Sequence, residues 1–218
     1  MVPIMTTSAE PSATALVRLA TWLSPAFPTG AFAYSGGLEA AFSSGQVDRS
    51  TLTGWVEDLL RSGSLRQEAV LCALSARGFD VSGLALALVA APERREETLA
   101  QGEAFARAAT AWNGDWPDDA VPLPCAVGRA ARLAGLPLEE TLAVFVQSQT
   151  SNIMQAAQRL GMIGQREGVA LQARLEPLVV ETARFACRAD ESDIGACTLA
   201  AEIAALRHST LSSRIFRS

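Results

Sequence analysis

The chain has 218 residues, a formal net charge of −5 and a hydrophobic fraction of 49%, which together exclude a disordered protein. Charged residues make up only 19%, below the roughly 25% of an average soluble domain, and this suggests that a partner covers part of the surface. The negative charge and the absence of a basic run argue against nucleic acid as that partner.

Apolar residues at helical spacing predict an all-α chain organised as a single-domain multi-helix bundle. Residues 1–12 are polar and broken by proline, so we expect a flexible N-terminus followed by one helical domain over residues 13–206. The first predicted helix ends before Pro25, because the residue that precedes a proline is pushed out of the helical region. The helices predicted in the first half of the chain cover residues 13–23, 34–44, 50–62, 64–77, 84–91 and 93–112.

Residues 113–124 form the main predicted loop, with three prolines and three aspartates. The composition is the same on either side, which favours a surface loop within one domain over a boundary between two domains. Three glycines, Gly161, Gly164 and Gly168, predict a break between two helices, since no strand precedes them as a dinucleotide-binding motif requires. The helices predicted after the loop cover residues 126–134, 137–160, 167–188 and 194–208.

Residue types needed for several kinds of catalysis are missing. All 18 basic residues are arginine, so there is no lysine for a Walker A loop, a Schiff base or a pyridoxal-phosphate anchor. A serine-hydrolase triad would need the single histidine, His208, as its base, but the sequence contains no GxSxG motif. We therefore interpret His208 as a packing or hydrogen-bonding residue. The paired acids at residues 96–97, 118–119 and 139–140 are expected on the solvated surface. We therefore expect no catalytic residue and no cofactor.

The four cysteines form no CxxC motif and no Cys/His cluster, so we expect no metal site. We expect buried free thiols in a reducing compartment, with a disulfide between Cys187 and Cys197 as the less favoured alternative. The longest apolar run, residues 84–91, is far shorter than the roughly 20 residues that a membrane helix needs, and the N-terminus lacks the basic region of a signal peptide. These features predict a cytoplasmic protein without a membrane partner.

Two segments have patterns that indicate contacts. Residues 147–158 (QSQTSNIMQAAQ) carry uncharged polar side chains all round a predicted helix. Burying such a group without a hydrogen-bond partner costs about 1–3 kcal/mol, so this stretch must face water, a polar cavity or a partner.

Residues 207–218, hereafter the tail segment, combine three arginines with Leu211, Ile215 and Phe216. A floppy tail rarely keeps such apolar anchors, which favours a C-terminal docking tail.

Three segments resemble the UreF family of urease accessory proteins. LATWLSPAFPTGAFAYSGGLEAAFSSGQV at residues 19–47, hereafter the signature segment, is similar to the family's opening signature, roughly L-x-x-S-P-A-x-P-x-G-x-F-x-Y-S-x-G-L-E. SNIMQAAQRLGMIGQREGVALQARLEPLV at residues 151–179 is similar to the long central helix pair of the family. ALRHSTLSSRIFRS at residues 205–218 is similar to the family's ending, commonly R-H-E-x-x-Y-S-R-L-F-x-S. The three matches follow in the right order and cover most of the chain.

The resemblance implies an all-α accessory protein that is not an enzyme. Proteins of this family form dimers and stand between the scaffold UreD, also called UreH, and the GTPase UreG, in a complex that delivers nickel to urease. We therefore expect a homodimer whose partners are UreD/UreH, UreG and the urease apoprotein. A regulator that stimulates GTP hydrolysis by UreG in trans is one alternative, and a generic helical adaptor is another.

By the same resemblance, the residues expected to bind partners are Tyr34, Ser35, Glu39, Arg207, His208, Arg214 and Phe216. The loop of the signature segment would take its shape from Pro25, Pro28 and Gly30. For Ser35 and Glu39, a role in starting the following helix is the alternative. The chain departs from the family pattern at Ser209 and Ser212, where the tail usually carries Glu and Tyr. This departure leaves open which hydrogen bonds dock the tail.

Overall fold

The computed structural model describes residues 12–114 and 120–218, and in these ranges it contains helices and loops without a strand. This confirms the predicted all-α class. The predicted flexible N-terminus and the centre of the predicted loop lie almost wholly outside the described residues. The helices are α1 (Ala13–Trp22), η1 (Ala31–Ala33), α2 (Leu38–Ser43), α3 (Leu52–Ser62), α4 (Ser64–Ala76), α5 (Ser82–Ala87), α6 (Pro92–Asn113), α7 (Leu123–Leu133), α8 (Leu138–Arg159), α9 (Gln165–Arg188), η2 (Glu191–Asp193) and α10 (Leu199–His208).

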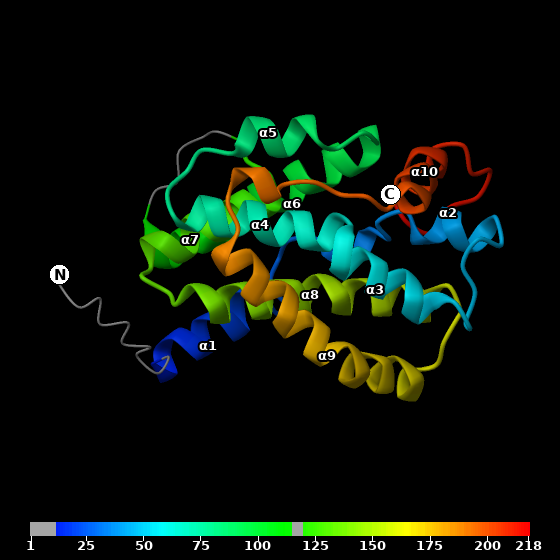
Figure 1. The fold of residues 1–218 in the computed structure, drawn as a ribbon, viewed down its shortest axis with the longest axis horizontal. Coiled ribbons are helices and arrows are strands. Elements are labelled where there is room, and N and C mark those ends of the chain that lie inside the picture. Colours follow the sequence, from blue (N-terminus) through cyan, green and yellow to red (C-terminus); the bar gives the residue numbers. More distant parts are fainter. Residues whose placement is uncertain (1–11, 115–119) are drawn as a thin grey trace.

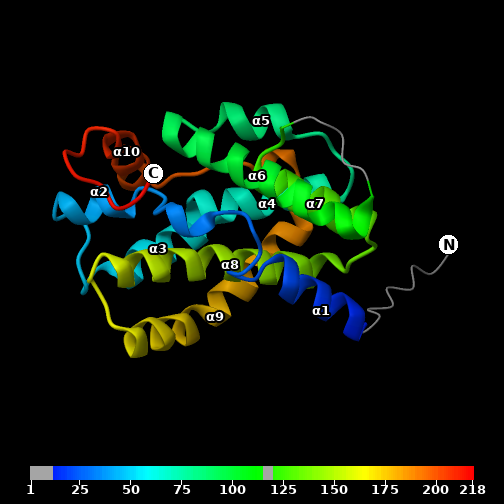
Figure 2. The ribbon, with the colours of Figure 1, turned by 180° about the vertical axis from the view of Figure 1, so that it is seen from behind.

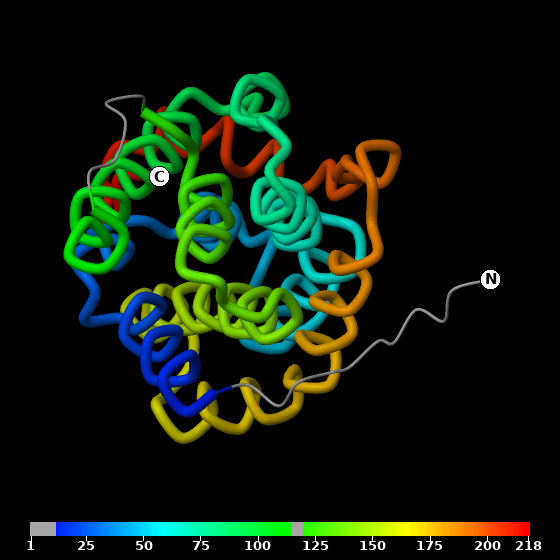
Figure 3. The backbone as a smooth tube through the Cα atoms, turned by 90° about the vertical axis from the view of Figure 1, so that its left-hand side faces the viewer, coloured from blue at the N-terminus to red at the C-terminus, as the bar shows by residue number. Residues whose placement is uncertain are grey.

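Helix α4 runs through the middle of the molecule and contacts α3, α7, α8 and α9 (Figure 1). Every residue from Ala69 to Ser75 is buried, so the helix is enclosed on all sides rather than on one stripe. Helices α5 and α6 lie on one side of α4 and α8 and α9 on the other, and the reverse view in Figure 2 shows the same layers. The view along the long axis in Figure 3 places α1 and α9 at the lower edge of this arrangement.

The last helix, α10, packs against α2, so the C-terminal end of the chain lies beside the signature segment at one end of the molecule (Figure 1). Gly37 permits this approach, because a Cβ atom added there would lie 2.9 Å from the backbone nitrogen of Ala205. Gly37 also has a φ of 86°, and Gly36 before it a φ of 62°. These left-handed conformations keep α2 from starting before Leu38, so the predicted helix start at residue 34 is wrong.

Two further helices are shorter than the apolar pattern predicts. The helix predicted over residues 84–91 ends at Ala87, and Ala91 is extended (ψ 123°) because Pro92 follows it. The helix predicted over residues 194–208 begins at Leu199. Before it, the chain pairs with the end of α3, where the amide of Cys197 donates to the carbonyl oxygen of Ser62 at 2.7 Å. Such a tertiary hydrogen bond leaves no local signal in the sequence.

Of the three glycines predicted to separate two helices, two lie at the break. Gly161 follows α8 with a φ of 72°, and Gly164 precedes α9. Gly168 lies inside α9, so its predicted place in the break is wrong. A Cβ atom at Gly168 would lie 2.2 Å from Nε2 of Gln158, so the glycine leaves room for the end of this side chain.

All four cysteines are free, with Cys72 and Cys125 buried, Cys187 partly buried and Cys197 exposed. The disulfide between Cys187 and Cys197 is therefore not formed, and the expectation of four buried thiols is wrong for Cys197. Burial, partly offset by a hydrogen bond from Ser82, raises the pKa of Cys125 to about 11.

Among the described helices, none offers an apolar stretch of the length that a bilayer crossing would need.

Candidate functional site

The tail segment is docked along the signature segment by backbone hydrogen bonds. The amide of Ser35 donates to the carbonyl oxygen of Ser218 at 2.8 Å, and the Ser35 hydroxyl donates to the same oxygen at 2.5 Å. The amide of Arg217 donates to the carbonyl oxygen of Ala33 at 2.8 Å. Ser35 also accepts a hydrogen bond from the amide of Glu39 at 3.3 Å, so one hydroxyl serves both the start of α2 and the tail segment.

Glu39, in the first turn of α2, lies beneath the tail segment and holds it through its carboxylate. Its Oε1 accepts the amide hydrogen of Ile215 at 2.7 Å, and its Oε2 accepts that of Phe216 at 3.0 Å. Burial opposes the charge, but hydrogen bonds from Ile215, His208 and Phe216 outweigh it and lower the pKa of Glu39 from its ordinary value of 4.5. The resulting stabilisation is present at neutral pH and is lost as the pH falls through the lowered pKa.

His208 ends α10 and is fully buried between two carboxylates. Its Nδ1 lies 2.7 Å from Oε2 of Glu93, and its Nε2 lies 3.0 Å from Oε2 of Glu39. A ring that carries protons on both nitrogens donates to both carboxylates, whereas a neutral ring donates to only one. Glu93 also accepts a hydrogen bond from Nη1 of Arg214 at 2.6 Å, so it ties both α10 and the tail segment to α6. The sequence-based interpretation of His208 as a hydrogen-bonding residue is confirmed.

Aromatic and cationic side chains cover the remaining contact between the tail and signature segments. Phe216 is 4% exposed, and the guanidinium of Arg159 lies 4.2 Å from the centre of its ring. Arg159 also donates to the carbonyl oxygen of Phe32, two residues before Tyr34 in the signature segment. The guanidinium of Arg217 lies 5.8 Å from the centre of the Tyr34 ring. Such cation–π contacts contribute about 0.5–2 kcal/mol each.

The tail segment also reaches the interior of the molecule through Ser218. The Ser218 hydroxyl donates to Oε2 of Glu97, a carboxylate that is buried on α6. Oε1 of the same residue lies 2.5 Å from Nη1 of Arg94 and 3.1 Å from Nε2 of Gln101. Arg94 in turn pairs with Glu68 of α4 at 3.1 Å. The docked tail is therefore continuous with a buried polar network between α4 and α6.

The other predicted site residues lie around this contact. Gly30 precedes η1 with a φ of 71°, a left-handed conformation that glycine adopts without strain. Pro25 and Pro28 are exposed in the loop before it, and Arg207 is exposed in the last turn of α10. Ser209 and Ser212, the two departures from the family pattern, are both exposed, and the hydrogen bonds of Glu39 and Glu93 to the tail involve neither of them.

A cavity of about 140 Å³, hereafter cavity A, lies between α8 and the loop of the signature segment, and apolar residues such as Leu23, Phe32 and Phe105 form much of its lining. Its α8 wall consists of uncharged polar residues within the stretch 147–158 and the neighbouring Val144. Part of the stretch, which was predicted to face water, a polar cavity or a partner, therefore lines a cavity, although the other walls of that cavity are largely apolar. Trp22 lines the cavity, is buried, and has no hydrogen-bond partner for its Nε1 among the described residues. In a cavity of this size, the polar groups of the α8 wall can hold ordered water.

Two smaller cavities continue from cavity A towards α10. Cavity B, of about 40 Å³, shares Gln101, Gln149 and Asn152 with cavity A. Cavity C, of about 50 Å³, shares Glu68 and Arg94 with cavity B and reaches α5 and α10. The three cavities therefore follow one another through the molecule, with the network of Glu97 and Arg94 at the last junction.

Glu68 gives the fold a predicted pH dependence. Burial raises the pKa of Glu68 from 4.5 to about 7, although Arg94 opposes the shift. Since the folded chain then holds a proton that the unfolded chain releases, stability falls as the pH rises from about 4.5 to about 7. Thermal unfolding at a series of pH values should therefore show a declining Tm across this window. The Glu68→Gln variant should show a flatter profile, and an equal decline in both proteins would contradict the assignment to Glu68.

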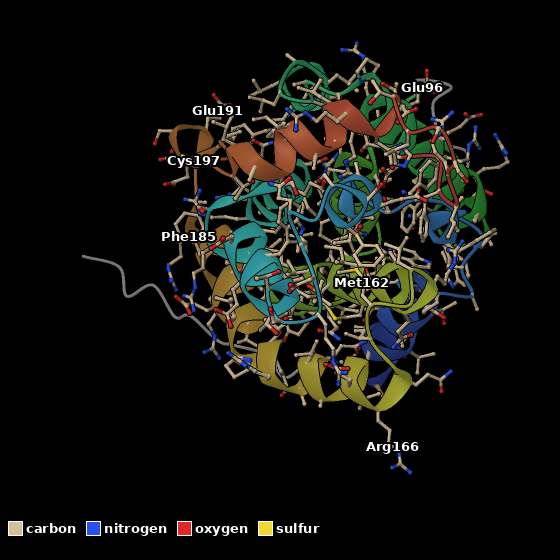
Figure 4. All side chains as sticks on the ribbon, turned by 90° about the vertical axis from the view of Figure 1, so that its right-hand side faces the viewer. Glu96, Met162, Arg166, Phe185, Glu191 and Cys197 are labelled. Carbon is tan, nitrogen blue, oxygen red and sulfur yellow. The ribbon has the colours of Figure 1, made fainter. Side chains whose placement is uncertain are left out.

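The sequence did not identify several residues of this site. Glu93, Arg94 and Arg159 each contact residues more than twenty positions away, so no local motif marks them. Glu97 belongs to an acidic pair that was expected on the surface, and it is 7% exposed. Its neighbour Glu96 is exposed, as Figure 4 shows at the edge of the molecule. Successive side chains of a helix point about 100° apart, so one residue of an acidic pair can face solvent while the next faces the interior. This helical period is the signal in the sequence that could have identified Glu97.

The described residues contain no group of three or more His, Cys, Asp or Glu side chains arranged to hold a metal ion. The hydrogen bonds of Glu39 and Glu93 are instead directed to His208, to Arg214 and to the tail backbone. This arrangement fixes a peptide segment in place, and it provides neither a nucleophile paired with a base nor a ligand set for a resident cofactor.

Comparison with known proteins assigns the chain to a family. The model of the UreF family matches residues 47–176. A protein named urease accessory protein UreF from Agrobacterium fabrum is 44% identical over 223 residues, covering 97% of this chain and 100% of that protein. Proteins of the same name are 44% identical in Rhizobium leguminosarum bv. trifolii, covering 94% of this chain and 96% of that one, and 45% identical in Cereibacter sphaeroides, covering 93% and 98%.

Proposed function

This chain belongs to the UreF family of urease accessory proteins, a non-catalytic family that takes part in urease maturation, and from that premise we propose that it bridges the UreD/UreH scaffold and the GTPase UreG. Membership of the family confirms the sequence-based recognition and the prediction that the chain is not an enzyme. The proposed bridge would be the route by which nickel is inserted into the active site of urease.

The observation that carries the proposal is the docked tail segment, which presents an outward face of apolar and basic groups. Ile215 is 59% exposed and Phe32 is 71% exposed, although their neighbours Phe216 and Ser35 are buried. Arg214 and Arg217 are exposed on the same segment. Exposed apolar groups beside arginines are typical of the centre of a protein–protein interface. We propose this face, together with Tyr34, whose ring lies against the guanidinium of Arg217, as the surface that UreD/UreH covers.

Cavity A supports the second part of the proposal, a path for nickel through the chain. Its α8 wall is polar and uncharged, with Gln147, Gln149 and Asn152 among its members. Neutral oxygen and amide groups solvate a hydrated cation without holding it as carboxylates would. A cation that must leave again is better served by such a wall than by a tight site.

The test is size-exclusion chromatography with light scattering on the chain alone, with UreD/UreH, and with UreG added. We expect a homodimer that forms a stoichiometric complex with UreD/UreH and then recruits UreG. Arg214→Ala and Tyr34→Ala should weaken binding of UreD/UreH by about tenfold or more, since anchors at interface centres typically contribute above 1 kcal/mol. Unchanged affinity in both variants would contradict the assigned surface.

A matched control is Arg184→Ala, which removes another exposed arginine ion pair, with Glu139. Arg184 lies in the last turns of α9, and Figures 1 and 2 show this end of the helix away from α10 and the tail segment. This variant should bind like the wild type. Loss of UreG turnover in a tail variant that still binds both partners would favour the GTPase regulator, and a chain that ignores UreD/UreH would favour the generic adaptor.

A further inference from the structure

The ring of His208 joins two helices of the body to the tail segment. Its nitrogens face a carboxylate on α2, Glu39 at 3.0 Å, and a carboxylate on α6, Glu93 at 2.7 Å. Each of these carboxylates also holds the tail segment. Oε2 of Glu39, which faces the ring, accepts the amide hydrogen of Phe216 as well. Glu93 faces the ring with Oε2 and accepts from Arg214 with Oε1. The ring therefore orients two carboxylates that dock the tail segment.

Both carboxylates are in the charged form in this arrangement. Burial opposes the charge of Glu39, but hydrogen bonds from the tail amides and from His208 outweigh it and lower the pKa of this carboxyl. Oε1 of Glu93 lies 2.6 Å from Nη1 of Arg214, which is the geometry of a charge-assisted hydrogen bond. A charged carboxylate accepts hydrogen bonds and has no hydrogen to donate. Both nitrogens of the His208 ring must therefore donate, so the ring carries two protons and a positive charge.

Loss of one ring proton would leave this arrangement without a hydrogen that it needs. A neutral imidazole has one donor and one acceptor nitrogen, so its acceptor would face a carboxylate oxygen at 3.0 Å or less. His208 is fully buried, so water does not reach this position to supply the missing hydrogen. Two facing acceptors in a buried place repel, and one carboxylate would have to turn away. Its contact with the tail segment would turn with it.

We propose that His208 is a proton-dependent switch of the tail segment: the doubly protonated ring fixes the two carboxylates that dock the tail, and loss of one ring proton as the pH rises releases it. Histidine is the side chain whose charge ordinarily changes nearest to neutral pH. Since docking needs the second ring proton, it is favoured at lower pH and weakens as the pH rises through the titration of the ring. On the acid side, docking lasts until Glu39 takes up a proton, which its lowered pKa delays.

The other charged groups of the neighbouring elements have partners of their own or face solvent. About one turn along α6 from Glu93, Glu97 pairs with Arg94 at 2.5 Å, and Arg94 also pairs with Glu68 of α4 at 3.1 Å. Arg207 on α10 is exposed. Among the described residues, the ring forms ion pairs with the carboxylates of α2 and α6 alone. Because the pKa of Glu68 is raised to about 7, the test below is repeated in Glu68→Gln, in which this carboxyl no longer titrates.

The test follows the ring and the tail segment in the same samples of the full chain, from about pH 5 to about pH 9. Nuclear magnetic resonance of the imidazole reports the ring protons, and the signals need no sorting because the chain has one histidine. Amide protection factors, which remove the intrinsic pH dependence of exchange, report docking. Protection at Ile215 and Phe216 should fall about tenfold or more in parallel with loss of the ring proton, without a change in α4. Constant protection across the ring titration, or a neutral ring under a docked tail, would overturn the proposal.

Glu93→Gln separates a switch from a merely structural role of the histidine. The amide of the new side chain can donate to the ring, so a neutral ring finds a partner on both sides. Protection at Ile215 and Phe216 should then no longer follow the ring titration. Glu96→Gln changes an exposed carboxylate on the same helix and should keep the wild-type profile. A Glu93→Gln profile equal to that of the wild type would contradict the switch. If Glu93→Gln does not fold, the comparison of ring and tail in the wild type decides.

A tail segment released at higher pH would withdraw the face proposed for UreD/UreH, and this consequence rests on the proposed function. Binding of UreD/UreH is therefore measured at both ends of the pH range, and weaker binding at the higher pH is expected. The link between ring and tail is measured on the chain alone. Failure of the partner to bind at either pH would contradict the proposed function, whereas uncoupled ring and tail signals would contradict the switch, so the two failures are distinguished.

Discussion

Glu39→Gln is expected to release the tail segment while the helical body stays folded. The carboxylate of Glu39 accepts the amides of Ile215 and Phe216 and contacts His208. In the variant, one oxygen becomes an NH₂ group that faces a donor instead of accepting from it. Hydrogen bonds to a charged group contribute about 1.5–3 kcal/mol each, so the loss is about 3 kcal/mol. That is below the roughly 5–15 kcal/mol that holds a domain together, so release should be local.

Amide hydrogen exchange measures this release directly. In Glu39→Gln, the amides of Ile215 and Phe216 should exchange on the order of a hundredfold faster than in the wild type, which corresponds to the expected loss of free energy. Exchange in the buried part of α4 should not change. Glu96→Gln is the matched control, because it neutralises an exposed carboxylate on α6 (Figure 4). Unchanged exchange at both tail amides would contradict the role of Glu39.

Glu39 illustrates what a family motif can and cannot predict. The resemblance selected Glu39, His208 and Phe216 as partner-binding residues, and the structure brings these three together. Glu39 is 5% exposed and His208 is fully buried, so neither reaches a partner directly in this state. We expect both to act as positioning residues that fix the tail segment. The motif selects the residues, whereas their burial, on which the expected positioning role rests, comes from packing between α2, α6 and α10.

The fold was predictable where the signal is local. Apolar spacing predicted helices over residues 50–62 and 64–77, and the structure has α3 and α4 at Leu52–Ser62 and Ser64–Ala76. It failed where a distant partner decides the conformation, as at Cys197, whose amide bonds to the end of α3. Apolar spacing also could not predict the row of cavities, because a polar helix face is equally compatible with solvent.

Nearby residues can differ completely in their surroundings. In Figure 4, Arg166 at the start of α9 extends into solvent while Met162 lies among the helices, although only a few residues separate them.

Gly128→Ala is expected to lower the stability of the whole fold, because α7 packs onto the central helix through this glycine. A Cβ atom at Gly128 would lie 2.2 Å from the carbonyl oxygen of Cys72 and 2.9 Å from the backbone nitrogen of Ala76. Both atoms belong to α4 or its end, which is enclosed by other helices and cannot shift alone. Overpacking of this kind costs about 1–3 kcal/mol and occasionally more, against about 1 kcal/mol gained from the higher helix propensity of alanine.

Because the obstructing atoms belong to the backbone, we expect the free energy of unfolding to fall by about 2 kcal/mol. For a chain of this length, such a loss lowers Tm by about 4–8 °C. The matched control is Gly54→Ala in α3, where the glycine is exposed and a new Cβ atom meets nothing within 4 Å. There only the propensity gain acts, so Tm should rise by about 2–4 °C. The same substitution should therefore change stability in opposite directions at the two sites. A rise in Tm for Gly128→Ala would mean that α7 and α4 are farther apart than this packing requires.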